Sequence, residues 1–274
     1  MEITIKEPLV SVIIPTFNRK GPLCELVESL SRQTFQDFEV IIVNDQGESV
    51  DYVTELYPEL KINITTPHQK LHHVGCRNEG LTHANGELIM LCDDDDFIVP
   101  DHLENMVKEL ADTDFVFTDV EMVEFKEKNN LRYATSRTLF SYEFDEELIR
   151  KFNTYVSSGS VYKKLIHELI GNFDEKLHNY WDWDFILRVM ESGVKVKKRP
   201  VASAIYAFTS DSGQLSSQLN ERRGSYLQKL SEKHQLGVLP QENFWTMMES
   251  PFVKRKRSES QVVWDGLPVK YRET

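Results

Sequence analysis

The segment ELIMLCDDDDFIVP, residues 87–100, places four consecutive aspartates between two apolar runs. The run 87–92 is short and continuous, which is typical of a strand buried on both faces. Four neighbouring carboxylates repel one another and lose hydration in apolar surroundings. A strand end that opens into a cleft is where such a cluster would serve a function, so residues 93–96 mark a candidate site.

Two more polar clusters follow apolar runs in the same way. The run LVSVII, residues 9–14, is followed by PTFNR at 15–19. The run FEVIIVND, residues 38–45, leads into NDQGES at 44–49. Ligands of open parallel sheets bind at the carboxyl ends of the strands. The three clusters are therefore predicted to share one edge of a sheet.

Helical patterns alternate with these runs over the first 120 residues. The pair Asp101 and Glu104 has the spacing of a capping box at a helix start. Such alternation predicts an α/β fold with a mostly parallel sheet and helices on both faces. Helices are predicted over 21–33, 49–57, 74–84 and 101–112, and further strands over 61–66 and 114–125.

The alternation loosens after residue 125. The tetrad EKNN at 127–130 indicates a hairpin turn, and residues 145–170 hold short helical patterns. An amphipathic helix is predicted over 179–193, a strand, turn and strand over 194–208, and a polar helix over 216–234. No repeat or low-complexity linker interrupts the chain, which favours one continuous unit.

Composition places the 274-residue chain among soluble globular proteins, with 40% hydrophobic and 28% charged residues. Its net charge of −12 argues against a nucleic-acid partner. Cys24, Cys76 and Cys92 have no metal-ligand or CxxC spacing, so we expect reduced core thiols in a cytoplasmic protein. The N-terminus lacks a signal-peptide pattern and no apolar run reaches 18 residues, so we expect no membrane span.

The acidic cluster has three interpretations from its residues. It is a solvated turn, a calcium loop, or a site where one or two carboxylates hold Mg²⁺ or Mn²⁺ with substrate phosphates. Asp93, Asp95 and Glu104 match positions 1, 3 and 12 of an EF-hand, but Phe97 and Ile98 stand where it needs a ligand and a glycine. The calcium loop is excluded, and a dication would remove the mutual repulsion of the carboxylates.

Four segments, in this order, resemble the family 2 glycosyltransferases with the GT-A fold. They cover roughly residues 9–210 and read VSVIIPTFNR, EVIIVND, GCRNEGLTHANGELIMLCDDDD and WDWDFILRVMESG. The resemblance implies a Rossmann-like, mostly parallel sheet flanked by helices, with a small antiparallel region on the acceptor side. It also implies one domain over 1–250, with a nucleotide-sugar-binding half at 1–125 and an acceptor-binding half at 126–250, before a basic tail at 251–274.

The resemblance assigns the nucleotide to the first half. The loop after the first strand would border it, through Pro15, Thr16, Phe17, Asn18 and Arg19. For Pro15 and Phe17 simple loop packing is an open alternative.

Two further residues are implied to face the nucleotide. Asp45 would accept a ring N–H of the base, with an Asx-turn before Gly47 as the alternative. Arg77 would also face the nucleotide, with a surface ion pair to Glu79 or Glu87 as the alternative.

The family's Asp-any-Asp metal motif, counted back from Pro100 and Asp101, falls on Asp93 and Asp95. The resemblance implies Asp95 as the direct ligand of Mn²⁺ or Mg²⁺, with Asp93 and Asp94 near the nucleoside and ribose. The acidic Asp94 is a variation of this chain, and Asp96 has no assigned role.

The resemblance also implies a catalytic base, a carboxylate on the acceptor side that takes a proton from the attacking hydroxyl. The family's Glu-Asp pair corresponds to Trp181-Asp182, which makes Asp182 the base and leaves Trp181 in place of the usual Glu. Trp181 would offer a sugar-stacking face, or the pair is shifted. Asp184 is interpreted as a helix-start charge, and Trp183 and Phe185 as core.

Many relatives supply a late histidine near the metal, but the corresponding stretch 206–216 contains none. Thr209, Ser210 or Asp211 would stand in for it. His72 and His73 precede a predicted helix, and we interpret them as solvent-exposed loop residues rather than cleft residues.

These implications together predict a metal-dependent inverting transferase that moves a sugar from a UDP-sugar, or a thymidine or guanosine donor, to an acceptor hydroxyl. The acceptor would be a saccharide or a lipid-linked one, in bacterial polysaccharide or glycoconjugate synthesis. A pyrophosphorylase is disfavoured because PTFNRKGP lacks a glycine-rich phosphate loop. A degenerate nucleotide-sugar-binding subunit stays open.

The basic cluster Lys254–Arg257 suggests that the cytoplasmic protein makes a weak peripheral contact with the membrane. A solvated tail is the favoured interpretation of this segment.

Overall fold

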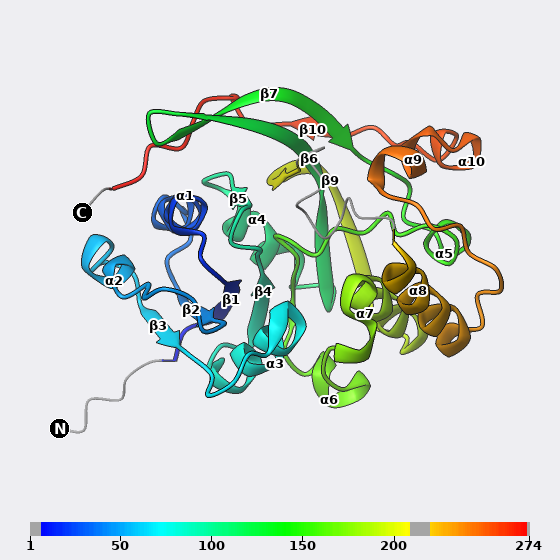
Figure 1. The fold of residues 1–274 in the computed structure, drawn as a ribbon, viewed down its shortest axis with the longest axis horizontal. Coiled ribbons are helices and arrows are strands. Elements are labelled where there is room, and N and C mark those ends of the chain that lie inside the picture. The colour runs from blue at the N-terminus through cyan, green and yellow to red at the C-terminus, as the bar shows by residue number, and fades with distance from the viewer. Residues whose placement is uncertain (1–6, 209–219, 273–274) are drawn as a thin grey trace.

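A computed structural model describes residues 7–208 and 220–272 of the chain, and its core is one ten-stranded mixed sheet (Figure 1). The strands lie in the order β10-β9-β6-β8-β4-β1-β2-β3, with β5 paired to β9 and β7 to β6. The parallel first half consists of β1 Val10–Thr16, β2 Phe38–Asn44, β3 Ile62–Thr65 and β4 Leu88–Leu91. The mixed α/β sheet and its parallel first half agree with the fold predicted from the alternation.

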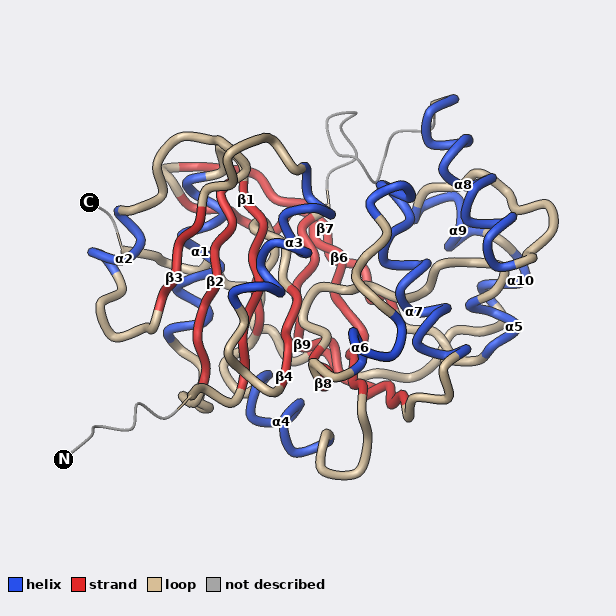
Figure 2. The backbone as a smooth tube through the Cα atoms, turned by 90° about the horizontal axis from the view of Figure 1, so that it is seen from below, coloured by secondary structure: helices blue, strands red, loops and turns tan. Residues whose placement is uncertain are grey.

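Strand β1 shows why these apolar runs become central strands. All seven of its residues are buried, and successive side chains alternate between two cores. Val12 and Ile14 pack with helix α1, Lys20–Ser31, whereas Ile13 packs with helix α3, His72–His83. Both faces are therefore covered, as the continuous hydrophobic run requires, and α1 and α3 lie on opposite sides of the sheet (Figure 2).

Antiparallel strands enter in the second half. Strands β6, Phe115–Lys128, and β7, Leu131–Phe140, form a hairpin around Asn129 and Asn130, whose φ angles of 52° and 56° suit a tight primed turn. Strand β8, Val161–Lys163, runs antiparallel to β4 and β6. The hairpin turn predicted over 127–130 is confirmed.

The strand, turn and strand predicted over 194–208 is wrong. One strand, β9 Val196–Ala207, runs through it parallel to β6. Its register jumps from Arg199 to Ala202, because Pro200 has no N–H to give to the ladder and a bulge absorbs it.

Several helices are shorter than predicted, among them α2, Tyr52–Leu56, and α7, Trp181–Glu191. Of the polar helix predicted over 216–234, residues 216–219 lie outside the described residues, and the described part is α8, Glu221–His234, capped by Asn220, which accepts the N–H of Arg223. The capping box predicted at Asp101 does not form, since Asp101 accepts from the Asn105 side chain instead. The other helices are α4 His102–Glu109, α5 Glu146–Ile149, α6 Ile166–Ile170, the 3₁₀ helix η1 Glu175–Tyr180, α9 Phe244–Glu249 and α10 Pro251–Lys254.

The C-terminal segment 251–272 packs along the domain, while Lys254, Arg255 and Arg257 of the basic cluster are exposed to solvent. Strand β10, Gln261–Val262, adds to β9, and the Trp264 ring lies 5.4 Å from that of Phe97 in strand β5, Phe97–Ile98. Arg272 then forms an ion pair with Glu59, beyond α2. The segment thus returns across the molecule to the first half (Figure 1).

No helix within 7–208 or 220–272 is long and apolar enough to cross a membrane.

Candidate active site

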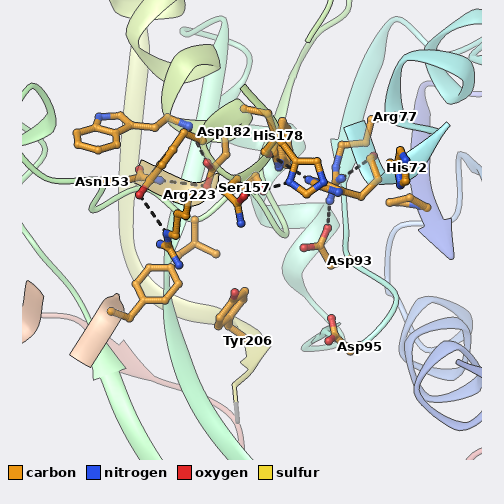
Figure 3. A pocket seen from close by; sticks show the side chains of 18 of the residues that line it. His72, Arg77, Asp93, Asp95, Asn153, Ser157, His178, Asp182, Tyr206 and Arg223 are labelled. Carbon is orange, nitrogen blue, oxygen red and sulfur yellow. Dashed lines mark hydrogen bonds and ion pairs between the residues drawn. The ribbon is translucent and has the colours of Figure 1, made fainter. Parts of the chain in front are cut away.

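A cleft of about 510 Å³ opens at the carboxyl ends of β1, β2 and β4. Its first wall comes from these strand ends and from the start of α3. Its second wall comes from the second half of the chain, from residues 151–157, the start of α7 and residues 240–247. Figure 3 shows Asn153, Ser157 and Asp182 of this wall across from Asp93 and Arg77. The first wall contributes Pro15, Thr16, Phe17, Arg19, Asp45, Arg77, Asp93, Asp94 and Asp95, and the second contributes Asp182.

The four aspartates after β4 have different surroundings. Asp93 forms an ion pair with Arg77, and Asp95 forms one with Arg19. Asp94 is buried and accepts a 2.7 Å hydrogen bond from the Thr16 hydroxyl. Asp96 is fully buried, does not line the cleft, and accepts the N–H of Ala207 at 2.8 Å. Asp96 therefore fixes β9 against the acidic turn rather than facing a ligand.

Crowding and burial disfavour full ionisation of this cluster. Burial and the neighbouring charge of Asp95 raise the pKa of Asp94 to about 7. Burial, assisted by Asp93, also raises the pKa of Asp95 despite its ion pair with Arg19. The ion pairs with Arg19 and Arg77 thus leave part of the negative charge of the four carboxylates unbalanced.

The donor set of the acidic cluster fits a hard dication only in part. Asp93 and Asp95 offer carboxylate oxygens, which Mg²⁺ and Mn²⁺ prefer. Over the described ranges no three His, Cys, Asp or Glu side chains are grouped to hold a metal ion. A metal here would take its remaining ligands from solvent and substrate, as Mg²⁺ sites with phosphate substrates do.

The loop after β1 is divided between cleft and scaffold. Phe17 is 43% exposed, and the ammonium of Lys70 lies 3.4 Å from the centre of its ring. Pro15, Thr16 and Arg19 line the cleft with Phe17. Asn18 is not among the cleft-lining residues, and its side-chain oxygen accepts the N–H of Glu48. Its role is to join two loops, and its φ of 54° fits that turn.

Asp45 shapes the cleft through the backbone of the next element. Its two carboxylate oxygens accept the N–H groups of Leu71 and His72, at 2.7 and 3.0 Å. The Asx-turn before Gly47 belongs to Asn44, whose side chain accepts the Gly47 N–H. Asp45 therefore fixes the start of α3 at the edge of the cleft.

Arg77 connects the two walls. It is 2% exposed and pairs with Asp93 rather than with Glu79 or Glu87, so the alternative of a surface ion pair is wrong. It donates a 2.7 Å hydrogen bond to the His73 carbonyl, and its guanidinium carbon lies 4.1 Å from the centre of the Trp181 ring.

Asp182 lies at the start of α7, on the second wall (Figure 3). It accepts the N–H of Trp183 at 2.8 Å and the Asn153 amide at 3.1 Å. Burial raises the pKa of Asp182 to about 6, although both hydrogen bonds favour the charged form. A carboxylate of this kind is ionised near neutral pH and more basic than an ordinary aspartate, as a general base should be.

The neighbours of Asp182 are core residues. Trp183 donates its indole N–H to the Ile149 carbonyl, and Phe185 is fully buried, as predicted for both. Asp184 is fully buried and accepts from Arg188 and His234, so it is more than a helix-start charge.

His72, His73 and His178 line the cleft, so the prediction that His72 and His73 lie outside it is wrong, although His72 is exposed as predicted. His73 packs edge-on against His178 at 4.4 Å, and burial lowers the pKa of His73 to about 3. His72 and His178 have φ angles of 58° and 35°, in the left-handed region that non-glycine residues rarely adopt. Such strain at a cleft is typical of functional sites.

Sequence reasoning missed most of the second wall. Asn153, Tyr206, Arg223, Glu242 and Phe244 all line the cleft and come from separate elements. Only their convergence in space marks them, although the polar start of α8 at Arg223 was a weak signal. The proposed stand-ins for the late histidine, Thr209, Ser210 and Asp211, lie outside the described residues.

The chain is similar in sequence to known glycosyltransferases. The family model of glycosyl transferase family 2 matches residues 11–170. The uncharacterized glycosyltransferase YwdF of Bacillus subtilis is 51% identical over 260 residues, 95% of this chain and 97% of YwdF. The amylovoran biosynthesis glycosyltransferase AmsB of Erwinia amylovora is 24% identical over 203 residues, 70% of this chain and 67% of AmsB.

Solved structures share the fold at low identity. TarS 1–349 of S. aureus, in complex with UDP-GlcNAc, matches with a TM-score of 0.63 and 18% identity over 82% of this chain and 66% of TarS 1–349. The mannosyltransferase PcManGT of Pyrobaculum calidifontis, in complex with GDP-Man and Mn²⁺, matches with a TM-score of 0.61 and 19% identity over 86% of this chain and 67% of PcManGT. The chain thus spans about two thirds of each solved structure.

The strand-end acids, the facing carboxylate and the family match therefore lead to one conclusion: this chain belongs to glycosyl transferase family 2 and is a glycosyltransferase of the GT-A fold.

Proposed function

We propose that the protein transfers a sugar from a nucleotide-diphosphate donor to an acceptor hydroxyl with inversion at the anomeric carbon. The observation that carries the proposal is the placement of Asp182 across one cleft from Asp93 and Asp95. A base on one wall and a charge-binding cluster on the other suit a displacement in which the acceptor attacks and a diphosphate leaves. No covalent intermediate is required.

The donor would lie along the first wall. Phe17 and Asp45 border the end of the cleft where the nucleobase of the donor would bind, and Arg19 would approach the diphosphate. UDP-sugar is the donor we propose first, because TarS, which shares the fold, was solved with UDP-GlcNAc. GDP-sugar is the second candidate, since PcManGT was solved with GDP-Man, and a thymidine donor is the third.

Asp93 and Asp95 would hold a divalent metal, Mn²⁺ or Mg²⁺, which PcManGT supports through its Mn²⁺ complex. When bound, the metal would neutralise charge on the diphosphate leaving group. Asp94 would keep its hydrogen bond from the Thr16 hydroxyl, which already occupies one of its carboxylate oxygens, and would not bind the metal.

Asp182 would take the proton of the attacking hydroxyl. Asn153 and the Trp183 N–H fix its two oxygens, so that the carboxylate keeps one orientation at the helix start. Arg77 lies close enough to favour its charged form. These contacts hold a base in place without neutralising it.

The acceptor would enter along the second wall, where Asn153, Arg223, Glu242 and Phe244 offer hydrogen-bonding groups and an aromatic face. This mixture suits a saccharide, free or lipid-linked. The name of AmsB supports a role in polysaccharide synthesis.

A weak peripheral membrane contact through Lys254–Arg257 is also proposed for this cytoplasmic enzyme. Lys254 pairs with Glu249, and Lys256 with Asp145, so much of the local charge is already balanced. Flotation with vesicles that contain anionic lipid, using a variant with all four basic residues changed to Gln, tests the contact. Equal partitioning of both proteins would refute it.

The experiment that tests the proposed function measures release of UDP or GDP from a panel of nucleotide-sugars, with and without Mn²⁺, for the wild type and Asp182→Asn. Metal-dependent release that falls in the variant supports the enzyme. The alternative, a nucleotide-sugar-binding subunit, is favoured by Trp181 in place of Glu. Nucleotide binding by calorimetry without release or transfer would support that subunit instead.

A further inference from the structure

Trp181 has the position where the family resemblance implies a glutamate, yet it is not an open platform for a sugar. It is only 6% exposed. One side of its ring lies 4.1 Å from the guanidinium carbon of Arg77, and its ring packs edge-on against Phe173 at 5.1 Å. The ring is thus held by the core and in turn holds Arg77.

The guanidinium carbon of Arg77 lies over the face of the Trp181 ring, so the N–H groups along the edge of the guanidinium group are not used by Trp181. One terminal nitrogen of Arg77 donates to the His73 carbonyl, and the other to Asp93. The Nε–H is buried and has no hydrogen-bond partner in the described part of the chain. Because Arg77 lines the cleft and an unsatisfied N–H is costly, this unpartnered donor of its side chain points to a ligand atom that would complete it.

A glutamate at position 181 would act differently. Carboxylates bind guanidinium groups along the edge, through N–H groups in the plane. Such a side chain would compete with Asp93 for Arg77. An aromatic face attracts the cation without using any of its N–H groups.

We propose that Trp181 is a positioning residue that holds Arg77 by its ring face. Arg77 thereby keeps its edge for Asp93 and for an oxygen of the donor's ribose or diphosphate. This inference rests on the proposed function. It also links the two walls, because Trp181 directly precedes the base Asp182 in the first turn of α7.

Calorimetry with UDP and Mn²⁺ tests the inference in three variants. Trp181→Leu removes the ring face and should raise the Kd by roughly 3- to 30-fold, the range that cation–π energies correspond to. Trp181→Phe should restore most of the affinity. Trp181→Glu should raise the Kd at least as much as Leu does, because the new carboxylate draws Arg77 away from Asp93.

Phe185→Leu is the matched control. Phe185 lies in the same helix, is fully buried and packs on the same Phe173 at 4.7 Å, but its ring is not against Arg77. The control should lower the melting temperature and leave the Kd for UDP unchanged. A Kd raised equally by Phe185→Leu would reduce Trp181 to a core residue and overturn the inference.

A second measurement needs no nucleotide. In proton NMR the Nε–H and δ-methylene signals of Arg77, identified by their loss in Arg77→Lys, should be shifted upfield by the Trp181 ring. Trp181→Leu should abolish the shift and Trp181→Phe should keep part of it. If wild type binds neither UDP nor GDP, the proposed function fails while this arm still tests the contact. An unshifted Arg77 signal in wild type would refute it.

Discussion

Asp182 and Asp184 stand two residues apart in the first turn of α7, and they face opposite sides of the helix. Asp182 opens to the cleft, and within the described residues its hydrogen-bond partners are a backbone N–H and the Asn153 amide. Asp184 is completely buried between α7 and α8, where Arg188, Lys233 and His234 all approach within 2.8 Å.

The two carboxylates respond oppositely to burial because their partners differ. Burial raises the pKa of Asp182 to about 6, and its two neutral donors do not offset this. Burial would also raise the pKa of Asp184, but the hydrogen bond from His234 and the charge of Arg188 hold it below its usual range. One turn of helix therefore carries a base suited to catalysis and an ion cluster suited to holding α8 in place.

Asp182→Asn should have the largest effect on activity and so distinguish the role of Asp182 from that of Asp184. Loss of a general base is expected to lower kcat by roughly 10²- to 10⁴-fold, because the amide cannot take the acceptor proton. Steady-state transfer assays measure kcat. The affinity for UDP is the control, and it should hardly change. A variant with near wild-type kcat would remove Asp182 from the mechanism.

Asp184→Asn should instead unfold the protein more easily. Removing one partner of a buried ion cluster leaves charges uncompensated and costs about 3–5 kcal/mol of the free energy of unfolding. Urea denaturation of the two variants compares them directly. Asp182→Asn should match or exceed wild-type stability at pH 7, since it removes an unpaired charge. Equal destabilisation by both substitutions would contradict the division of roles.

Sequence periodicity predicted the first wall because its residues follow directly from strand ends. Once the runs at β1, β2 and β4 are recognised as parallel strands, Thr16, Asp45 and Asp93 must share an edge. This inference needs only local patterns and the geometry of a sheet. The structure accordingly gathers them in one cleft.

The second wall could not be predicted in this way. Asp182 was found through the family resemblance, but the partners of the two α7 carboxylates come from residues 153 and 234, far along the chain. The packing of 251–272 likewise depends on Trp264 and Arg272 meeting residues of the first half. Such contacts leave no periodic signal, so local patterns do not predict this packing.

The acid limb of the pH profile sharpens the comparison. Asp182 must be ionised to act as a base, so kcat/KM should fall about tenfold per pH unit below about pH 6. The contributions of Asp182 and Asp184 to the free energy of unfolding depend on pH in opposite directions. Asp182, with its raised pKa, favours folding at low pH and loses that contribution as the pH rises through about 6, whereas Asp184 loses its contribution as the pH falls. An acid limb near pH 4 would show that Asp182 is not the titrating base.

Arg272→Ala tests an ion pair of the opposite kind and should have the smallest effect. Arg272 contacts Glu59 at 2.5 Å, but both side chains are 43% exposed, so water and salt screen their attraction. Exposed pairs contribute about 1 kcal/mol or less. Urea denaturation should therefore show a small change that disappears at high salt, although the pair joins the end of the chain to the first half. A loss as large as that of Asp184→Asn would mean that the C-terminal segment is held mainly at this point and not by Trp264 and β10.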